Sequence, residues 1–445
     1  MSQATYQQKA RLLSEQFRQD TQPVQLEKST SNLFRTRQQT ASRRVDVRNL
    51  DQVLSVDNDR QLVEVEGMCT YEQLTAACLQ HQCMPLVVPQ LKSITIGGAV
   101  AGIGVESTSF RLGLPHESVT SMDVLLGSGE IVTCTPENEY SDLFYGIPNS
   151  YGTLGYVLKL TARTMPVKPY VALTHTRYND IDEYFRAVDE ACHGDAEFVD
   201  GSIFGRNEMY LTQGRFCDEA PYTNDYSWLK IYYRSIRERS EDFLKVRDYI
   251  WRWDTDWFWC SQHLFVQNLP MRLLVGRRHL NSITYQKIMR WNARVGFKAK
   301  LNKMLGNQPE SVVQDVDIPI ERAPDFLRFF HEEIGIPQVW MCPVLVDETS
   351  LKFPHFSYGK PGLYVNFGFW DIVDNPDHQP PGYFNKKVED KVGELGGIKS
   401  LYSDVFYEED RFWRLYNGDH YSALKQKYDP QGRLKNLYQK CVLRG

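Results

Sequence analysis

The amino-acid sequence predicts an α+β fold with more than one domain, and three observations lead to that prediction. Short runs that alternate apolar and polar residues fill positions 28–65, separated by Asp and Asn turns. Pro166 and Pro169 then interrupt the chain, which indicates a domain boundary. Beyond them the pattern changes to alternating strands and helices, and 445 residues suffice for two or three domains with a large core.

The elements expected before the prolines follow from local patterns. A polar helix is expected over 5–18, and a helix over Tyr71–Gln82 places Leu74, Cys78 and Leu79 on one face. Strands are expected at 84–89 and 151–163. The run 123–134 predicts a hairpin, because the sequence Gly-Ser-Gly supplies a turn between two apolar strands.

The second part of the chain is expected to mix both kinds of element. The apolar spacing of 181–191 predicts a helix, and 225–305 is expected to be mostly helical. Residues 313–320, 338–346 and 363–370 have the composition of strands, and 371–383 that of a loop. From Asp404 the pattern is helical until Asp429-Pro430-Gln431-Gly432 interrupts it.

Composition excludes several classes of protein. The net charge of −5 and pI near 6.1 exclude a general nucleic-acid binder. No run of about 18 apolar residues is present, so no transmembrane helix is expected. Nine scattered cysteines without C-x-x-C spacing fit reduced thiols in a cytoplasm, and the histidines are too dispersed for a metal site. We therefore expect a cytoplasmic protein; the oligomeric state stays open.

The segment Thr95–Ser107 (T-I-G-G-A-V-A-G-I-G-V-E-S) holds four glycines and two alanines. So few side chains let a backbone lie directly against a ligand, with peptide N–H groups aimed at charged oxygens. The spacing differs from the dinucleotide fingerprint G-x-G-x-x-G, and no long helix is expected directly after it. A tight glycine turn in a sheet protein is the alternative interpretation.

A second pair of motifs favours the ligand-binding interpretation. Asp142-Leu143-Phe144-Tyr145 precedes Gly152-Thr153-Leu154-Gly155-Tyr156-Val157, and the hairpin 121–131 lies before both. In order and spacing these motifs resemble the FAD domain of the vanillyl-alcohol-oxidase (PCMH-type) superfamily. The resemblance implies an FAD-binding domain at 1–167, an α+β cap or substrate domain at 168–400, and a C-terminal segment at 401–445 that returns to the FAD domain.

A narrower resemblance rests on four stretches, at 95–109, 134–145, 339–343 and 401–418. They are similar to the 24-dehydrocholesterol reductase family of Δ24-sterol reductases. This resemblance implies an FAD-dependent oxidoreductase that reduces a C=C bond of an apolar sterol or isoprenoid substrate, with NADPH as electron donor. The N-terminal membrane anchor of the eukaryotic members is lacking here, so a soluble or peripheral relative is expected. The alternatives are an alcohol or sugar oxidase or dehydrogenase, and a non-catalytic flavin- or lipid-binding protein associated with membranes.

The same resemblance implies cofactor contacts. Glu106 is expected to accept hydrogen bonds from ribityl hydroxyls or to have a structural capping role. The FAD pyrophosphate would rest on backbone N–H groups between Ile96 and Gly104. The adenine end would lie against the second motif. The residues implied are Thr95, Ile96, Gly97, Gly98, Gly102, Gly104, Glu106, Ser107, Thr108, Gly152, Gly155 and Val157.

Covalent attachment of FAD is not expected, because the histidine that often forms that link lies in the first phosphate loop and the first histidine here is His81. The N-terminal region instead carries arginines, whose guanidinium groups match the geometry of a phosphate and are candidates for binding the pyrophosphate. The alternative interpretation is that they form a solvated basic loop. They are Arg35, Arg37, Arg43 and Arg44, close to Ser31 and Asn32.

The C-terminal segment supplies the candidate catalytic residues. Reduction of a C=C bond needs a hydride from the cofactor and a proton from a positioned acid. Tyr421 or His420 is the candidate acid, and Lys425 the candidate for holding negative charge on the reduced ring. Tyr402 and Asp404 lie on the same segment. An ordinary surface helix is the alternative interpretation.

An aromatic cluster is the remaining outlier. Trp251, Trp253, Trp257, Phe258 and Trp259 are candidates for peripheral membrane contact or for lining the entrance of an apolar substrate. A core of the cap domain is the alternative. Nearby, Arg277-Arg278-His279 are candidates for contacts with lipid headgroups or a nicotinamide cofactor, or for a solvated face.

Overall fold

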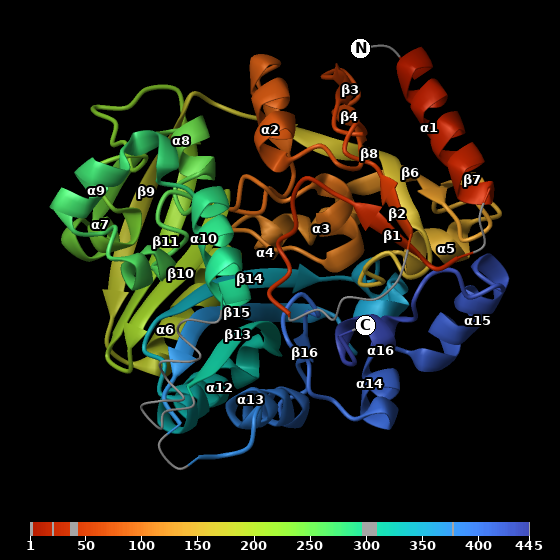
Figure 1. The fold of residues 1–445 in the computed structure, drawn as a ribbon. Helices are drawn as coiled ribbons and strands as arrows, with labels where there is room; N and C mark the ends of the chain where they lie inside the picture. Colours follow the sequence, from red (N-terminus) through yellow and green to blue (C-terminus); the bar gives the residue numbers. More distant parts are fainter. Residues whose placement is uncertain (1–2, 20–21, 36–42, 296–308, 376–377, 445) are drawn as a thin grey trace.

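Two antiparallel sheets form the framework of the protein (Figure 1). The computed structural model describes residues 3–19, 22–35, 43–295, 309–375 and 378–444. The prediction of an α+β fold is confirmed. The chain passes from one sheet to the other between Pro166, where β8 ends, and Tyr170, where β9 begins. Among the residues described, no helix has both the length and the apolar content needed to cross a bilayer.

The first sheet has six strands in the order β3-β4-β8-β6-β7, with β5 paired to β8. The hairpin expected over 123–134 is confirmed as β6 and β7, closed where the Leu126 N–H donates to the Glu130 carbonyl at 2.8 Å. The strands are β3 (Val53–Asp57), β4 (Leu62–Glu66), β5 (Cys83–Pro85), β6 (Val119–Leu125), β7 (Ile131–Cys134) and β8 (Tyr156–Pro166).

Helices and a strand pair cover this first sheet. The helices expected at 5–18 and 71–82 are confirmed as α1 and α2. The glycine segment forms a short helix, α3, where the sequence indicated none. The elements are α1 (Gln3–Arg18), α2 (Tyr71–Gln80), α3 (Ile96–Gly102), α4 (Ser109–Leu112), α5 (Ser141–Gly146) and the parallel pair β1 (Val24–Glu27) and β2 (Arg43–Asp46).

The second sheet has eight strands in the order β12-β9-β11-β10-β14-β15-β13-β16. The strands expected at 313–320, 338–346 and 363–370 are confirmed as β13, β14 and β15. The strands are β9 (Tyr170–Tyr178), β10 (Phe198–Gly205), β11 (Glu208–Cys217), β12 (Glu241–Lys245), β13 (Glu310–Pro319), β14 (Val339–Val346), β15 (Gly362–Val373) and β16 (Ile398–Lys399).

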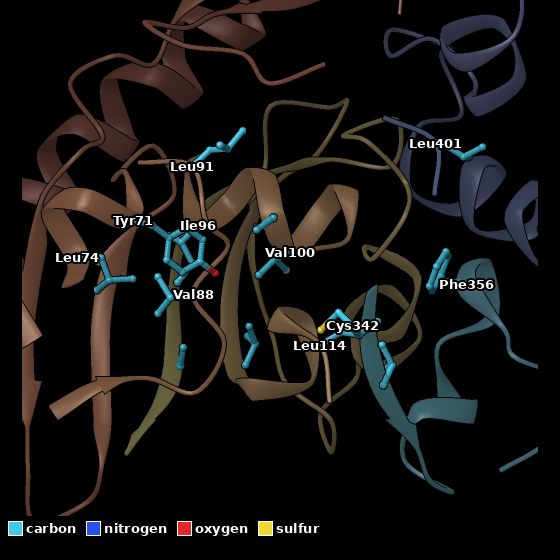
Figure 2. Close-up of a cluster of buried hydrophobic side chains, with 14 of the residues drawn as sticks. Tyr71, Leu74, Val88, Leu91, Ile96, Val100, Leu114, Cys342, Phe356 and Leu401 are labelled. Carbon is cyan, nitrogen blue, oxygen red and sulfur yellow. The ribbon is translucent and has the colours of Figure 1, made fainter. Parts of the chain in front are cut away.

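Period-two alternation gives the second sheet two apolar faces. One face packs beneath α6 (Ile181–Cys192), α12 (Ala323–Phe329) and α13 (Tyr383–Glu394), where Phe326 and Phe367 share a core. The opposite face belongs to the large core that also holds α2 and α3. Figure 2 shows that core, with Cys342 of β14 near Leu114 and α3 close to Val88.

In the region 225–305, residues 225–295 contain a strand as well as helices, so the expectation of a mostly helical region is only partly right there; residues 296–305 lie outside the described part of the chain. Strand β12 interrupts it, because residues 241–245 pair with the edge strand β9. The helices of the region are α7 (Tyr232–Glu238), α8 (Val246–Ile250), α9 (Leu269–Val275) and α10 (Ser282–Val295).

The aromatic cluster is part of the core. Trp253 and Trp259 are at most 1% exposed, and Phe258 stacks on Trp370 of β15 with ring centroids 4.4 Å apart. Trp251 and Trp257 are also buried. Side chains enclosed in this way do not reach a membrane, so the interpretation of the cluster as a membrane contact is wrong and the core alternative holds.

The C-terminal segment packs back onto the first sheet's domain. Its helices are α14 (Glu409–Leu415), α15 (Gly418–Tyr428) and α16 (Leu437–Cys441). Lys427 of α15 pairs with Asp142 of α5 at 2.7 Å, and Tyr428 donates to the same carboxylate at 2.6 Å. The two ends of the described chain meet here, where the Val24 N–H donates to the Arg433 carbonyl at 3.1 Å.

Candidate functional site

The N-terminal end of α3 is already hydrogen-bonded within the chain. The side chain of Thr95 caps the helix by accepting from the Gly98 N–H at 3.2 Å. The N–H groups of Ile96 and Gly97 donate to the carbonyls of Cys69 and Gly67, each at 3.0 Å. In this arrangement these N–H groups are already used within the chain, and their expected contact with a pyrophosphate stays a prediction.

Gly97 has a structural reason to be glycine. A Cβ at this position would lie 2.7 Å from the carbonyl oxygen of Gly67, so a side chain would push α3 away from the strand end at β4. Gly155 is similar, since its Cβ would lie 2.4 Å from the Val124 side chain. Val157 pairs with Val124 inside the sheet and is 5% exposed. Gly155 and Val157 therefore have packing roles in the core, and their expected contact with the adenine end stays a prediction.

The C-terminal end of α3 differs from its N-terminal end in how its backbone N–H groups are used. Ile103 has a φ of 64°, a left-handed conformation that a β-branched residue rarely adopts. Within the described part of the chain, the N–H groups of Ile103, Gly104 and Val105 find no acceptor. All three residues are half-buried. These donors make 103–105, rather than 96–98, the part of the glycine segment that is suited to an anionic ligand.

A second strained turn supports this end of the helix. Tyr151 has a φ of 51° and the following Gly152 a φ of 75°. The Tyr151 N–H and hydroxyl donate to the carbonyls of Ala101 and Gly102 at 2.8 and 2.7 Å. Gly152 thus supplies a left-handed turn that holds Tyr151 against α3, and this explains why the second motif has a glycine at position 152.

Glu106, Ser107 and Thr108 form a junction between the two sheets. Oε1 of Glu106 accepts from Arg252 at 2.9 Å and from the Ser107 hydroxyl at 2.8 Å. Arg252 also donates to Asp200 of β10 at 2.9 Å, and the Thr108 hydroxyl donates to the Leu86 carbonyl at 2.7 Å. These groups were expected to contact the ribityl chain or phosphate. Glu106 links this segment to Asp200 of the second sheet through Arg252, whereas the Thr108 hydroxyl bonds within the first sheet's domain. Their contacts with the cofactor stay a prediction.

Burial determines the electrostatics of this junction. Both side chains of the Arg252–Glu106 pair are under 8% exposed. Burial raises the pKa of Glu106, and the Arg252 guanidinium opposes that rise. The guanidinium also lies over the Tyr249 ring, 4.1 Å from its centroid. The junction is thus a buried cation held between two carboxyl groups, Glu106 and Asp200.

The N-terminal segment that carries Asn32 and Phe34 contacts both domains at this point. The Asn32 amide oxygen accepts from Ser93 at 3.0 Å and from Gln286 of α10 at 2.6 Å. Phe34 packs edge-on to Tyr402, with ring centroids 5.7 Å apart, and its N–H donates to the Tyr402 carbonyl at 2.9 Å. Phe34 also contacts Trp257, so this segment brings an aromatic lining to the region between the two sheets.

Among the arginines of its group that the structure describes, Arg35 is the one that lies in the candidate site. It is 5% exposed and lies over the Tyr151 ring at 4.9 Å. Nη1 donates to the Leu401 carbonyl, whereas Nε is buried without a partner. Arg43 and Arg44 lie on β2, with Arg44 exposed, and Arg37 lies outside the described residues.

The second sheet contributes an acidic group that sequence reasoning missed. Asp315 lies on β13 opposite Gly368 of β15, where a Cβ would come within 2.7 Å of its Oδ1. That oxygen is buried without a hydrogen-bond partner. Burial, together with the neighbouring charge of Asp317, raises the pKa of Asp315 to about 8, and the Tyr402 hydroxyl opposes that rise. The signal in the sequence is the alternation V-Q-D-V-D-I, which puts two carboxyl groups on one face of a largely apolar strand.

Tyr402 is the predicted catalytic residue that the structure brings to this acid. Its hydroxyl accepts from the Trp370 indole at 2.9 Å. Burial, together with Asp315, raises the pKa of Tyr402 well above its ordinary value, so the phenol keeps its proton. Asp404, by contrast, contacts Arg444 at 3.5 Å and offers its carbonyl to Lys399.

The other predicted catalytic residues have structural partners. The Tyr421 hydroxyl donates to Thr153 at 2.8 Å and accepts from the Leu437 N–H at 3.0 Å. Lys425 donates to the carbonyls of Thr153 and Leu434 and pairs with Asp429 at 2.7 Å.

His420 likewise faces inward, with Nδ1 3.3 Å from Nε2 of His355. The polar atoms of Tyr421 and Lys425 thus hold α15 to Thr153 in the turn after α5, whereas His420 contacts His355. The catalytic roles expected for these three residues stay predictions. In the described part of the chain, no group of three or more His, Cys, Asp or Glu side chains is arranged to hold a metal ion.

Comparison with known proteins agrees with the geometry. Residues 6–135 match a family model described as an FAD binding domain. Delta(24)-sterol reductase of Homo sapiens is 28% identical over 407 residues, which cover 88% of this chain and 76% of the human protein. The enzyme of that name from Pisum sativum is 25% identical and covers 89% and 76%. Cytokinin dehydrogenase 10 of Oryza sativa is 28% identical but covers only 36% of this chain.

These matches define an FAD-binding oxidoreductase with a PCMH-type domain. Across both sheets and the C-terminal segment, the chain is similar to the Δ24-sterol reductases.

The residues present fit FAD. The unpaired N–H groups of 103–105 and the buried Nε of Arg35 are donors of the kind that a diphosphate requires. The rings of Phe34, Trp257 and Tyr402 provide flat apolar surface of the kind that a ring system requires.

Proposed function

We propose that this protein is an FAD-dependent reductase of a C=C bond in an apolar, sterol- or isoprenoid-type molecule. The observation that carries the proposal is the extent of the similarity. Resemblance to the Δ24-sterol reductases spans 88% of the chain, whereas the match to a cytokinin dehydrogenase covers 36%. A match over 88% of the chain must extend well beyond residues 1–167, into the region that decides what an FAD domain acts upon.

The cofactor is proposed to be held without a covalent bond, by the N–H groups of Ile103–Val105 and the guanidinium of Arg35. Bound FAD supplies the hydride for one carbon of the double bond. The aromatic side chains of Phe34, Trp257 and Trp370 exclude water from this region, which favours an apolar substrate.

Asp315 is the proposed proton donor for the second carbon. A carboxyl group whose pKa is about 8 is mostly protonated at neutral pH, so it has a proton to deliver. Tyr402 acts as a positioning residue through its contacts with Trp370 and Asp315. This role falls to Asp315 rather than to Tyr421, whose hydroxyl is already committed to Thr153.

NADPH is proposed as the electron donor, and anaerobic mixing of the purified yellow protein with NADPH tests this. Bleaching of the flavin band, followed by reoxidation on addition of a Δ24-unsaturated sterol, is the expected result. If NADPH leaves the band unchanged and an alcohol or sugar bleaches it with release of peroxide, the oxidase alternative replaces this proposal. Flavin that stays with the acid-precipitated chain would show covalent attachment instead.

The role of Asp315 is tested separately. Asp315→Asn is expected to keep bound FAD and bleaching by NADPH, while sterol reduction falls about a hundredfold or more. The matched control is Asp317→Asn, two residues along the same strand, whose carboxyl accepts from Asn366 and Tyr358. Equal turnover in Asp315→Asn and the wild type would remove Asp315 from the mechanism.

A further inference from the structure

Helix α9 carries its charge inside and its apolar residues outside. The Arg272 side chain is 1% exposed and pairs with both oxygens of Asp256, at 2.7 and 2.9 Å. Its neighbours Leu273 and Leu274 are 55% and 79% exposed. A surface helix of a soluble protein normally has the reverse arrangement, so this orientation needs an explanation.

The buried ion pair fixes that orientation. Besides Asp256, Arg272 donates to the carbonyls of Trp228 and Val266, which flank α9 in space. Each of these carbonyls lies next to a further exposed apolar side chain, Leu229 and Phe265. We call the exposed apolar side chains on and beside this helix the α9 apolar surface: Leu229, Phe265, Leu269, Met271, Leu273 and Leu274. Helices α7 and α9 lie at one edge of the molecule (Figure 1).

Cations surround the α9 apolar surface. Arg277 and Arg278 are exposed directly after the helix, and Arg277 is partly engaged by Asp225 at 3.0 Å. On the other side, a groove of about 270 Å³ lies between α7 and α9. Leu229 and Leu269 line it together with the buried Arg272, three further basic side chains (Lys230, Arg234 and Arg239) and one acidic side chain, Glu238.

We propose that the α9 apolar surface docks on a bilayer that contains anionic lipids. Large exposed apolar patches are rare on soluble monomers and mark interaction sites. A patch of leucines and one phenylalanine inserts at the acyl boundary, while flanking arginines and lysines meet headgroup phosphates. The buried aromatic cluster at 251–259 supports this surface from beneath, since Asp256 belongs to that segment.

This proposal stands independently of the proposed reaction, because vesicle binding requires neither NADPH nor substrate. The test is sedimentation of the full-length holoprotein with phosphatidylcholine vesicles, either pure or containing about one third phosphatidylserine. Binding to the anionic vesicles that weakens with added salt is the expected result.

The double substitution Leu273→Gln/Leu274→Gln is expected to lower partitioning about tenfold or more. Both side chains are exposed, so folding and the bleaching of flavin by NADPH are expected to be unchanged. The matched control is Leu12→Gln on α1, a leucine that is 52% exposed away from α9, and it is expected to bind like the wild type. Arg278→Glu is expected to reduce binding to the anionic vesicles only.

Two results would overturn the proposal. One is wild-type protein that stays in solution with both kinds of vesicle. The other is a wild-type dimer, seen by sedimentation velocity, that becomes monomeric in the Leu273→Gln/Leu274→Gln protein, which would make a second copy the occupant of this surface.

Discussion

Two buried pairs of carboxyl groups lie on or against the eight-stranded sheet, and they differ in what compensates their charge. Glu106 and Asp200 share the guanidinium of Arg252. Asp315 and Asp317 have only hydroxyl and amide neighbours, and no Lys or Arg of the described chain forms an ion pair with them. In the first pair, the Arg252 guanidinium opposes the rise in the pKa of Glu106 and links the two domains. The second retains a proton near neutral pH, as an acid catalyst requires.

Removing the cation from the first pair should have the largest effect. Arg252→Met leaves the carboxyl groups of Glu106 and Asp200 buried without a counter-charge, which is expected to lower the free energy of unfolding by about 3–5 kcal/mol. Urea denaturation of the FAD-loaded protein measures it. Arg278→Met removes an exposed guanidinium and should cost less than about 0.5 kcal/mol. Similar losses in the two proteins would mean that the buried cation does not hold the domains together.

The second pair should make stability depend on pH in a predictable direction. The pKa of Asp315 rises from its ordinary 3.8 to about 8 in the folded state. The folded protein therefore holds a proton that the unfolded chain has lost. This stabilisation is complete below about pH 4 and disappears as the pH rises through about 8, by up to about 1.4 kcal/mol per pH unit.

Asp315→Asn is expected to remove that slope. The window from pH 6 to 8 is the cleanest, because the pKa of Asp317 is about 6 and its own contribution has mostly ended there. Buried histidines are the same in both proteins, so their contributions cancel in the difference. Parallel stability curves for the wild type and the variant across this window would show that Asp315 is ionised in the folded protein.

Tyr421→Phe should have the smallest effect and separates structural from catalytic tyrosines. The hydroxyl bridges Thr153 and the Leu437 N–H, so its loss is expected to lower the free energy of unfolding by about 1–2 kcal/mol. Sterol turnover should stay within about twofold of the wild type. Turnover that falls by a larger factor at unchanged FAD content would return Tyr421 to the list of proton donors.

The sequence was a good guide to elements whose apolar periodicity is strong. Strands β13–β15 and helices α2 and α6 lie where the pattern predicts them, since each alternates apolar positions that face a core. Strand β12 was missed because E-D-F-L-K carries little apolar signal and forms only by pairing with the edge strand β9. The short helix α3 was missed because glycine disfavours helices, whereas here the Thr95 cap and the Gly67 contact stabilise it.

The site was harder to predict than the fold. Motifs located the glycine segment correctly, but they did not distinguish its hydrogen-bonded N-terminal end from the open end at Ile103, which depends on long-range contacts with Gly67 and Tyr151. Tyr402 was found because it lies in a recognisable stretch. Asp315 was not found. Its pKa is raised by burial beside Gly368 and Trp370, which are more than fifty residues away in sequence.

The meeting of the two chain ends bears on how the molecule is made. Phe34 and Arg35 contact Tyr402, Leu401 and Cys441, which lie more than 360 residues later in the sequence. The segment that carries the proposed phosphate-binding arginine therefore gains these contacts only after residues 401–441 have been synthesised. Because domains fold in order from the N-terminus during synthesis, the proposed phosphate-binding site is expected to be completed after the rest of the first sheet's domain has folded, and FAD is expected to bind more weakly to a chain that lacks residues 401–441.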